Sequence, residues 1–286
     1  MFFVVSACAS VCVAQPVAIS PRWQVNFPPA ANGKPGESTA VPVNGASMMV
    51  VVVAAGANPT NPTLQTGGRA VPAKMIGHDP VSRLGFIKVE GSVVPKSIAW
   101  AADAAASAST TLQAMEPAGL AKCRTTGWVK QVGEKFLPLA LLRVNFSNSV
   151  PPPGTPLLDD AGRVVAIVFQ SSGGGNVGYA LPAEAVHRVL RDISTGGQLS
   201  RGWLGLALRA ESQIPRISRV LPDSPAAAAG IQPNDVLLSI GSRQITDYAD
   251  AANAFFYLIP GQSVRVKLLR NVEQLEFTLM PTRPKG

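Results

Sequence analysis

Short apolar runs broken by glycine and proline restrict the fold of this chain more than any other sequence feature. Gly contributes 26 and Pro 25 of the 286 residues, whereas charged residues make up only 15%. Apolar runs of roughly four to eight residues between turn-forming residues are typical of strands, and the few charges disfavour a helical bundle. The segment MMVVVVAA at 48–55 is apolar throughout and predicts a buried strand. The sequence therefore predicts a mainly β chain, long enough for more than one core.

Further strands are expected along the chain, together with one clear helix. In PAEAVHRVLRDISTGG at 182–197, Pro182 can occupy the first helical turn, and two glycines end the segment. The alanine-rich stretch at 99–110 has helical propensity but can equally form a loop between strands. SSGGGNVG at 171–178 lacks the lysine of a phosphate-binding loop and is predicted to be a hairpin. Strands are predicted near 70–76, 84–90, 111–115, 125–131, 136–145, 163–169 and 177–181.

The N-terminal segment is interpreted as an export signal. Residues 1–14 are mostly apolar, are too few to span a bilayer as a helix, and end in the small-x-small sequence CVA. The alternative is a bacterial lipobox that would leave Cys8 lipidated, which is the one membrane attachment expected. Either interpretation predicts an exported protein of the periplasm or cell envelope. Residues 15–44 are rich in Pro, Gly and Asn and are predicted to be a loose segment.

Charge and cysteine usage exclude several classes of function. The net charge is +8, but the Lys and Arg residues are scattered and form no basic patch that could follow a phosphate backbone. We therefore predict no nucleic-acid partner. Beyond the leader, Cys123 is the one remaining thiol, and it is predicted to be a small core residue. Cys and His lack metal-ligand spacing and no cofactor motif is present, so neither a metal nor a cofactor is predicted.

The last unit contains three stretches of a recognisable pattern. They are GWLGL at 202–206, VLPDSPAAAAGIQPNDVLLSIGSRQI at 220–245 and PGQSVRVKLLRN at 260–271. In this order they resemble a PDZ domain of the bacterial, circularly permuted type. Asn234 stands where that family usually has glycine, a mild departure because asparagine tolerates a left-handed turn.

The resemblance implies a peptide-binding groove. The loop that ends at Gly205 would expose backbone N–H groups to a C-terminal carboxylate, and the strand after it would offer an edge to an extended peptide. A helix near 249–258 would form the other wall, with an apolar pocket between them. The alternative is a plain edge strand beside core phenylalanines. The predicted peptide-binding residues are Gly202, Trp203, Leu204, Gly205, Leu206, Ala207, Leu208, Ala251 and Phe255.

Three blocks of the first unit resemble another domain. They are GGRAVPAKMIGHDPVSRLGFIKVE at 67–90, GTPLLDDAGRVVAI at 154–167 and GGGNVGYALPAEAVHRVL at 173–190. In order, and followed by the PDZ pattern, they resemble the trypsin-like protease domain of the HtrA/DegP family. The predicted fold is thus mainly β. A degenerate trypsin-like double β-barrel over 45–198 is followed by a PDZ domain over 199–283, which is a small β-sandwich with two helices.

The family resemblance implies a catalytic triad in the order His, Asp, Ser, and this sequence departs from it at each expected place. Pro153 stands where the serine is expected, and proline has neither a hydroxyl nor the backbone N–H of an oxyanion hole. Arg83 stands where the aspartate is expected. The window MVVVVA at 49–54, where the histidine is expected, contains none. These departures predict a pseudoprotease that is not an enzyme.

The function predicted from the sequence is the binding of protein C-termini or extended peptides, as a scaffold, adaptor or regulator. One alternative partner is a homologous active protease. The alternative function is an active serine endopeptidase with a rearranged site, built from other polar residues. Neighbouring His78 and Asp79 do not normally point at each other in a strand or turn, which favours ordinary loop serines. The candidate groups are Ser82, Ser147, Ser149, Ser171, Ser172, His78 and Asp79.

Overall fold

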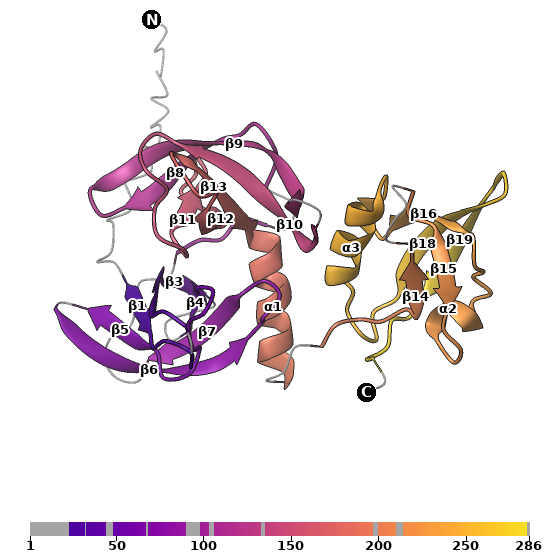
Figure 1. The fold of residues 1–286 in the computed structure, drawn as a ribbon, viewed down its shortest axis with the longest axis horizontal. Coiled ribbons are helices and arrows are strands. Elements are labelled where there is room, and N and C mark those ends of the chain that lie inside the picture. The colour runs from indigo at the N-terminus through magenta and orange to yellow at the C-terminus, as the bar shows by residue number, and fades with distance from the viewer. Residues whose placement is uncertain are drawn as a thin grey trace, which may run out of the picture.

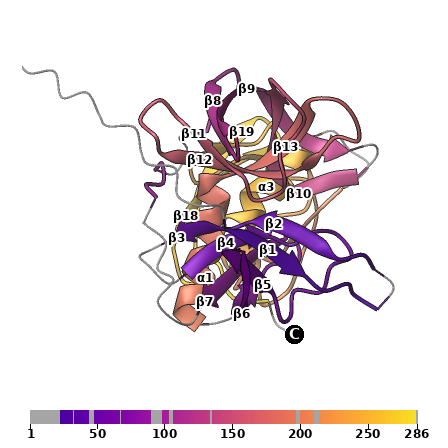
Figure 2. The same ribbon diagram turned by 90° about the vertical axis from the view of Figure 1, so that its left-hand side faces the viewer.

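The computed structural model of the chain consists of a larger β-rich part and a smaller C-terminal part that lie side by side (Figure 1). The larger part contains two sheets, one above the other in the view of Figure 2. Within the residues described here, none of the helices is long and apolar enough to cross a membrane. The structure describes residues 23–31, 33–43, 48–66, 68–89, 98–102, 106–132, 135–196, 200–209 and 214–284.

Seven antiparallel strands form the first sheet, in the order β2-β1-β5-β6-β7-β4-β3. β4 explains the apolar run predicted from the sequence. Met49 and Val51 enter a cluster on one side of this strand, while Val50 and Val52 enter another. The strand is therefore buried on both faces. The strands are Gln24–Phe27 (β1), Gly36–Thr39 (β2), Val41–Val43 (β3), Met48–Val52 (β4), Thr63–Thr66 (β5), Arg69–His78 (β6) and Leu84–Val89 (β7).

The first three strands correct the expectation of a loose segment over residues 15–44. Residues 24–43 contain β1, β2 and β3, which pair at both ends of the first sheet. Their burial alternates along each strand, as in QVNF and GEST, so one face contacts the core. Most polar side chains of these strands lie on the other face, whereas Ser38 is fully buried. Polar residues in such short strands give the segment the composition of a loop.

Six strands form the second sheet, which closes into a barrel in the order β10-β13-β12-β11-β8-β9. A third apolar cluster fills it and includes Leu142, Val168 and Cys123, which is buried as predicted. The hairpin predicted at 171–178 joins two of these strands. The strands are Thr111–Glu116 (β8), Gly119–Val132 (β9), Lys135–Phe146 (β10), Pro156–Leu158 (β11), Val164–Ser171 (β12) and Val177–Pro182 (β13).

Helix α1, Ala183–Gly196, follows the barrel and confirms the predicted helix. Val186, Val189 and Leu190 share a face and join a cluster with Leu84 and Phe86 of the first sheet. α1 therefore connects the two sheets through one apolar core. The described residues of the alanine-rich stretch, 99–102 and 106–110, contain no helix.

The C-terminal part has its own core, two sheets and two described helices. β14 and β15 form one sheet, and β17-β16-β18-β19 form the other. Asn271 has a φ of 54° in the tight turn between the last two strands. The elements are Leu206–Leu208 (β14), Ile217–Val220 (β15), Pro225–Ala228 (α2), Val236–Ile240 (β16), Arg243–Gln244 (β17), Tyr248–Phe256 (α3), Val264–Arg270 (β18) and Glu273–Leu279 (β19).

Helix α3 joins the C-terminal part to the barrel. The Lys130 ammonium of β9 lies 2.5 Å from a carboxylate oxygen of Asp250, and the Ala140 N–H of β10 donates to the side-chain oxygen of Asn253 at 3.0 Å. Phe256 is buried in the same cluster as α1, although it belongs to α3. The two parts therefore share one packed contact surface.

A second set of contacts between the two parts involves α1 and the linker that follows it. Arg188 and Asp192 are 5% and 7% exposed and form an ion pair of 2.5 Å. The Arg188 guanidinium also donates to the carbonyl oxygens of Leu258, just after α3, and Ser200 in the linker. The Ser200 N–H in turn donates to Asp192 at 3.1 Å. This pair therefore holds α1, the linker and the end of α3 together.

We predict that Asp192→Ala lowers the free energy of unfolding by about 3–5 kcal/mol, because it leaves a buried guanidinium without its counter-ion. Urea-induced unfolding of the full chain measures the loss. The control is Arg163→Ala, which removes an ion pair of the same i, i+4 spacing whose arginine is 51% exposed; about 0–1 kcal/mol is expected there. Equal losses in the two variants would contradict the role given to the buried pair.

Candidate functional site

The structure brings together the three stretches that the sequence analysis connected with catalysis. The carbonyl oxygen of Pro153 accepts hydrogen bonds from the Thr39 N–H at 2.7 Å and the Ser38 hydroxyl at 3.2 Å. The same Ser38 oxygen accepts the Val52 N–H at 3.0 Å. The next amide, Val53 N–H, donates to the Arg83 carbonyl oxygen at 2.8 Å. These residues therefore line one contact between the first sheet and the barrel.

Arg83 occupies this contact with its backbone in a left-handed conformation, at a φ of 58°. Its guanidinium stacks on the Phe169 ring at 3.8 Å and donates to the Gln170 side-chain oxygen at 2.7 Å. Burial lowers the pKa of Arg83 to about 10, because the charged form loses contact with water. Arg83 thus binds the β12 end of the barrel through stacking and a hydrogen bond.

Gly154 fixes the turn beside Pro153. It has a φ of 82°, and a Cβ atom at this position would lie 2.0 Å from the carbonyl oxygen of Thr39. Only glycine fits here, because the left-handed backbone and the close approach both exclude a side chain. Its N–H donates to Val168 of the barrel at 2.7 Å. The turn therefore brings the prolines into contact with the first sheet.

Asp79 and Ser82 form a compact turn next to Arg83. Asp79 is fully buried, and one carboxylate oxygen accepts the Ser82 hydroxyl at 2.6 Å. Its other oxygen accepts the guanidinium of Arg201, which begins the C-terminal part, at 2.7 Å. Burial lowers the pKa of His78, although the neighbouring Asp79 charge opposes the shift. No hydrogen bond joins His78 to Asp79 or to Ser82 in the described part of the chain.

The other candidate serines bond to nearby backbone or lie in exposed loops. Ser147 donates to the Lys122 carbonyl oxygen and Ser172 to that of Val177. Ser171 accepts the Gly173 N–H. The described residues contain no cluster of His, Cys, Asp and Glu that could hold a metal ion. Burial raises the pKa of the Cys123 thiol to about 12, which suits a core residue.

The loop that was predicted to bind a carboxylate turns at Gly205 in the structure. Gly205 has a φ of 78°, and a Cβ atom there would lie 2.1 Å from the Cβ atom of Ser224. The carbonyl oxygens of Leu204 and Gly205 accept the Ala226 and Leu221 N–H groups at 3.0 and 2.8 Å. The N–H groups of Leu204 and Gly205 donate to no described residue. The carbonyl groups of Leu204 and Gly205 are thus bonded within the domain, whereas their N–H groups bond to no described residue.

Strand β14 has one free edge. One hydrogen bond to the neighbouring strand lies just before β14, from the Leu221 N–H to the Gly205 carbonyl oxygen at 2.8 Å. Another lies just after β14, from the Arg209 N–H to the Arg216 carbonyl oxygen at 3.1 Å. In an antiparallel pair, successive residues of a strand alternate: one bonds to the partner strand, and the next directs its N–H and C=O away from that partner. Leu206 and Leu208 therefore direct their backbone groups toward the edge that no described strand covers.

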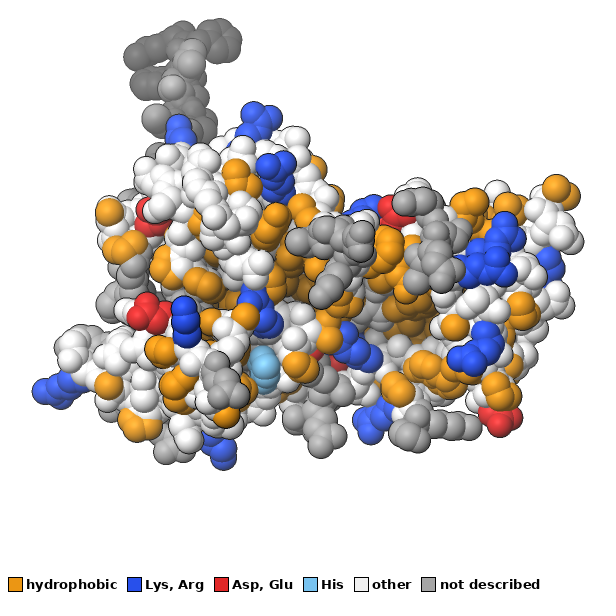
Figure 3. Space-filling model, viewed as in Figure 1, with side chains coloured by type: hydrophobic (Ala, Val, Ile, Leu, Met, Phe, Trp, Pro, Cys, Tyr) orange, Lys and Arg blue, Asp and Glu red, His pale blue; other side chains and the backbone are white. Residues whose placement is uncertain are grey.

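Ala251 and Phe255 of helix α3 were predicted to line the other wall of the groove, but only Phe255 is partly exposed. Phe255 is half-buried against the C-terminal core, together with Leu206 and Leu208 of β14. Ala251 is fully buried in that core, as is the side chain of Leu204. Neither of these two side chains reaches the surface, because the core of the domain closes over them. Figure 3 shows hydrophobic side chains gathered over α3 and β14.

The remaining loop residues have structural contacts. Trp203 forms a two-way backbone bridge with Thr282, at 2.8 and 3.0 Å. The Gly202 N–H donates to the Leu258 carbonyl oxygen at 3.0 Å, and a Cβ atom at this position would lie within 3 Å of the Leu258 and Pro281 side chains. These two residues therefore anchor the loop to the end of α3 and to the C-terminal segment. Their backbone N–H groups are occupied.

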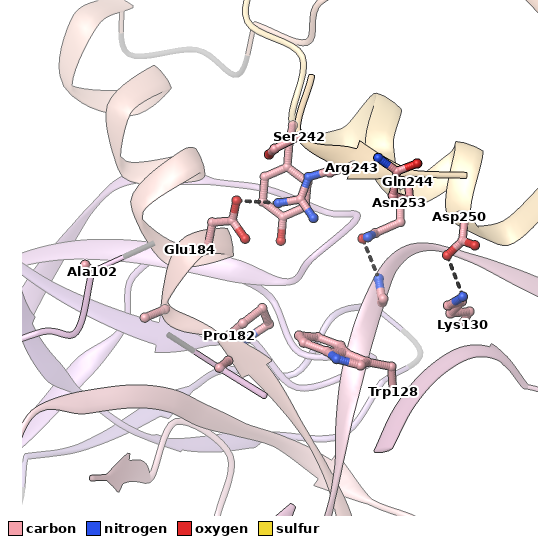
Figure 4. A pocket seen from close by; sticks show the side chains of 14 residues that line it. Ala102, Trp128, Lys130, Pro182, Glu184, Ser242, Arg243, Gln244, Asp250 and Asn253 are labelled. Atoms are coloured by element: carbon pink, nitrogen blue, oxygen red, sulfur yellow. Dashed lines mark hydrogen bonds and ion pairs between the residues drawn. The ribbon is translucent and has the colours of Figure 1, made fainter. Parts of the chain in front are cut away.

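Sequence reasoning missed a cavity of about 420 Å³ between the barrel and α3. In Figure 4, Trp128 and Lys130 of β9 lie below, and Arg243, Asp250 and Asn253 lie above. The charged groups pair across it, Arg243 with Glu184 and Lys130 with Asp250. The lining comes from elements far apart in the sequence, so no local pattern could indicate the cavity.

The comparisons with known proteins begin with the C-terminal part. The PDZ domain family model matches residues 202–280, which lie within the predicted 199–283. Curated relatives cover more of the chain. A probable periplasmic serine endoprotease DegP-like of Pseudomonas fluorescens is 29% identical over 222 residues, 70% of this chain and 46% of the relative. The protein of that name from Pseudomonas fulva is 31% identical over 69% of this chain and 45% of the relative. The chain spans about half the length of the curated relatives it matches.

Solved structures share the fold. An HtrA-type protease AlgW with tripeptide matches with a TM-score of 0.67 at 21% identity, over 93% of this chain and 94% of that one. A serine endoprotease from Yersinia pestis matches with a TM-score of 0.58 at 18% identity, over 93% and 96%. The predicted fold class is confirmed: the chain is mainly β, with an HtrA-type trypsin-like fold followed by a PDZ domain.

The prediction that the chain is not an enzyme is contradicted by these comparisons. The curated relatives are named serine endoproteases, and no comparison shows that the triad is replaced. The prediction placed Pro153 and Arg83 by matching short sequence blocks. At about 29% identity, loops between strands vary in length, and such matching does not fix their register. The chain is thus similar to serine endoproteases of the HtrA/DegP type, it shares the HtrA-type fold, and residues 202–280 match the PDZ domain family.

Proposed function

We propose that the PDZ domain of this HtrA-like protease binds extended peptides that end in a free carboxylate, in the groove between β14 and α3. The observation that carries the proposal is the free edge of β14. Leu206 and Leu208 direct their N–H and C=O groups toward it, as the flanking bonds to β15 require. An extended peptide can pair with such an edge as an added strand.

The carboxylate end of the peptide is assigned to the loop before β14. Leu204 and Gly205 each offer an N–H group that bonds to no described residue. Adjacent amides held in a fixed turn attract an anion, because their dipoles converge on one point. The turn is rigid, since the carbonyls of the same two residues are bonded to Ala226 and Leu221. A carboxylate at this position would receive charge-assisted hydrogen bonds.

The last side chain of the peptide is expected to be apolar. Leu206, Leu208 and Phe255 are half-buried around the groove and present carbon atoms on both walls. An apolar terminal side chain would cover this surface and remove it from water, which is favourable in proportion to the area covered. A charged terminal side chain would lose hydration without a partner.

Names of similar proteins agree with this assignment. Solved structures of the HtrA-type protease AlgW are described with a tripeptide and with a decapeptide, which supports peptide binding by a chain of this fold. The curated relatives are named periplasmic, which supports export to the periplasm. The partners we propose are C-termini or extended segments of envelope proteins. The predicted leader at 1–14, with the lipidation alternative at Cys8, lies outside the described residues.

We predict that peptides with a free C-terminus and an apolar last residue bind the full chain roughly 10-fold or more tightly than the same peptides with a C-terminal amide. Amidation removes the charge that the Leu204 and Gly205 amides would bind, and hydrogen bonds to charged groups contribute about 1.5–3 kcal/mol. Fluorescence anisotropy with a C-terminal peptide library measures both forms. Equal affinity of the acid and amide forms would show that the carboxylate is not recognised.

We also predict that N-methylation of single peptide amides weakens binding at alternate positions. An amide that pairs with β14 cannot donate once it is methylated, whereas the next amide points away from the strand and tolerates the change. The tolerant positions serve as the matched control within each peptide. Uniform sensitivity, or none, would contradict pairing with the β14 edge.

A further inference from the structure

Two arginines lie on or next to the β14–β15 pair, and their side chains have no partner among the described residues. Arg219 of β15 lies directly opposite Ala207, and Arg209 follows the last residue of β14. Both side chains are exposed. Neither makes a hydrogen bond or ion pair with any residue of the described chain.

Other arginines of the PDZ domain are already paired. Arg270 binds both carboxylate oxygens of Asp235 at 2.8 Å, and Arg243 pairs with Glu184. Arg216, the closest in sequence to Arg219, donates to the Asn234 carbonyl oxygen at 3.1 Å. The positive charge of Arg209 and Arg219 is thus not neutralised by any residue that the structure describes.

The register of the two strands places Arg219 on the outer face. Leu206 and Val220 pair with each other and pack on the domain core, as do Leu208 and Ile217. Side chains alternate between the two faces of a strand. Ala207 and Arg219, between these pairs, therefore point away from the core.

We propose that Arg219, with Arg209 beside it, selects peptides that carry Asp or Glu at the penultimate and fourth-from-last positions. This inference rests on the proposed pairing of a peptide with β14. If the terminal side chain enters the apolar groove, alternation directs the penultimate and fourth-from-last side chains to the outer face. They then lie on the face that Ala207 and Arg219 occupy.

The small side chain of Ala207 makes the contact sterically possible. A paired peptide would lie two strand spacings from β15, which is about 9.5 Å. Between them, on the outer face, stands only the methyl group of Ala207. The long side chain of Arg219 can therefore extend over it toward an acidic side chain, and its planar fork suits a carboxylate.

The test uses three peptides with the same apolar last residue and free carboxylate, which carry Glu, Gln or Lys at the penultimate position. Binding to the full chain is measured by fluorescence anisotropy at low and high salt. We expect the Glu peptide to bind about 2–5-fold more tightly than the Gln peptide and the Lys peptide to bind more weakly. The differences should shrink as salt screens the exposed charges.

Charge reversal provides the matched variants. Arg219→Glu should invert the order, so that the Lys peptide binds most tightly. Arg265→Glu makes the same charge change at a residue of β18 that is 74% exposed in the other sheet, and it should leave the order unchanged. Circular dichroism and thermal unfolding confirm that both variants fold like the parent.

Two results would overturn the inference, and they can be told apart. If all three peptides bind with equal affinity and still require a free carboxylate, charge selection by Arg219 is wrong while the proposed groove stands. If no peptide of any charge binds, the proposed groove is itself wrong and the inference falls with it.

Discussion

The packing of α3 between two cores is the constraint on which the arrangement of this molecule depends. Phe256 joins the apolar cluster of the larger β-rich part, whereas Ala251 and Ala254 belong to the core of the PDZ domain. Lys130 and the Ala140 N–H bind the polar side of the same helix. Helix α3, nine residues long, therefore packs against both parts of the molecule. Because Phe255 of this helix also borders the proposed peptide groove, contacts outside the PDZ domain hold that wall of the proposed groove in place.

Much of this fold could be predicted from the sequence, because its strongest signals are local. The apolar run at 48–55 contains β4, which is buried on both faces. The segment 182–197, which begins with Pro182 and ends with glycine, contains α1. The strands over 24–43 were missed, because each is only three or four residues long, and β1 and β2 contain several polar residues while β3 contains a proline. Such short strands gain their stability from pairing with distant strands, which a single sequence does not reveal.

The candidate site, too, could be predicted from the sequence only in part. Gly205 could be identified because GWLGL resembles the loop of a PDZ domain, and the structure gives it a φ of 78°, which suits glycine. The burial of Ala251 could not, since a helix residue can face a groove or a core at the same spacing. The contact of Pro153 with Thr39 and Ser38 joins residues more than a hundred positions apart. Their proximity was expected from a family resemblance alone, and the conclusion about activity drawn from it is contradicted by the relatives.

Amide hydrogen exchange at single-residue resolution, with and without a carboxylate-terminated apolar peptide, tests the central claim most directly. The free edge of β14 should become occupied, so exchange should slow at Leu206 and Leu208, and at Leu204 and Gly205 in the loop. Ala207 should change little, because its pairing direction is toward β15 in the free protein. Protection that appears in the cavity between the barrel and α3, with the β14 amides unchanged, would contradict the account.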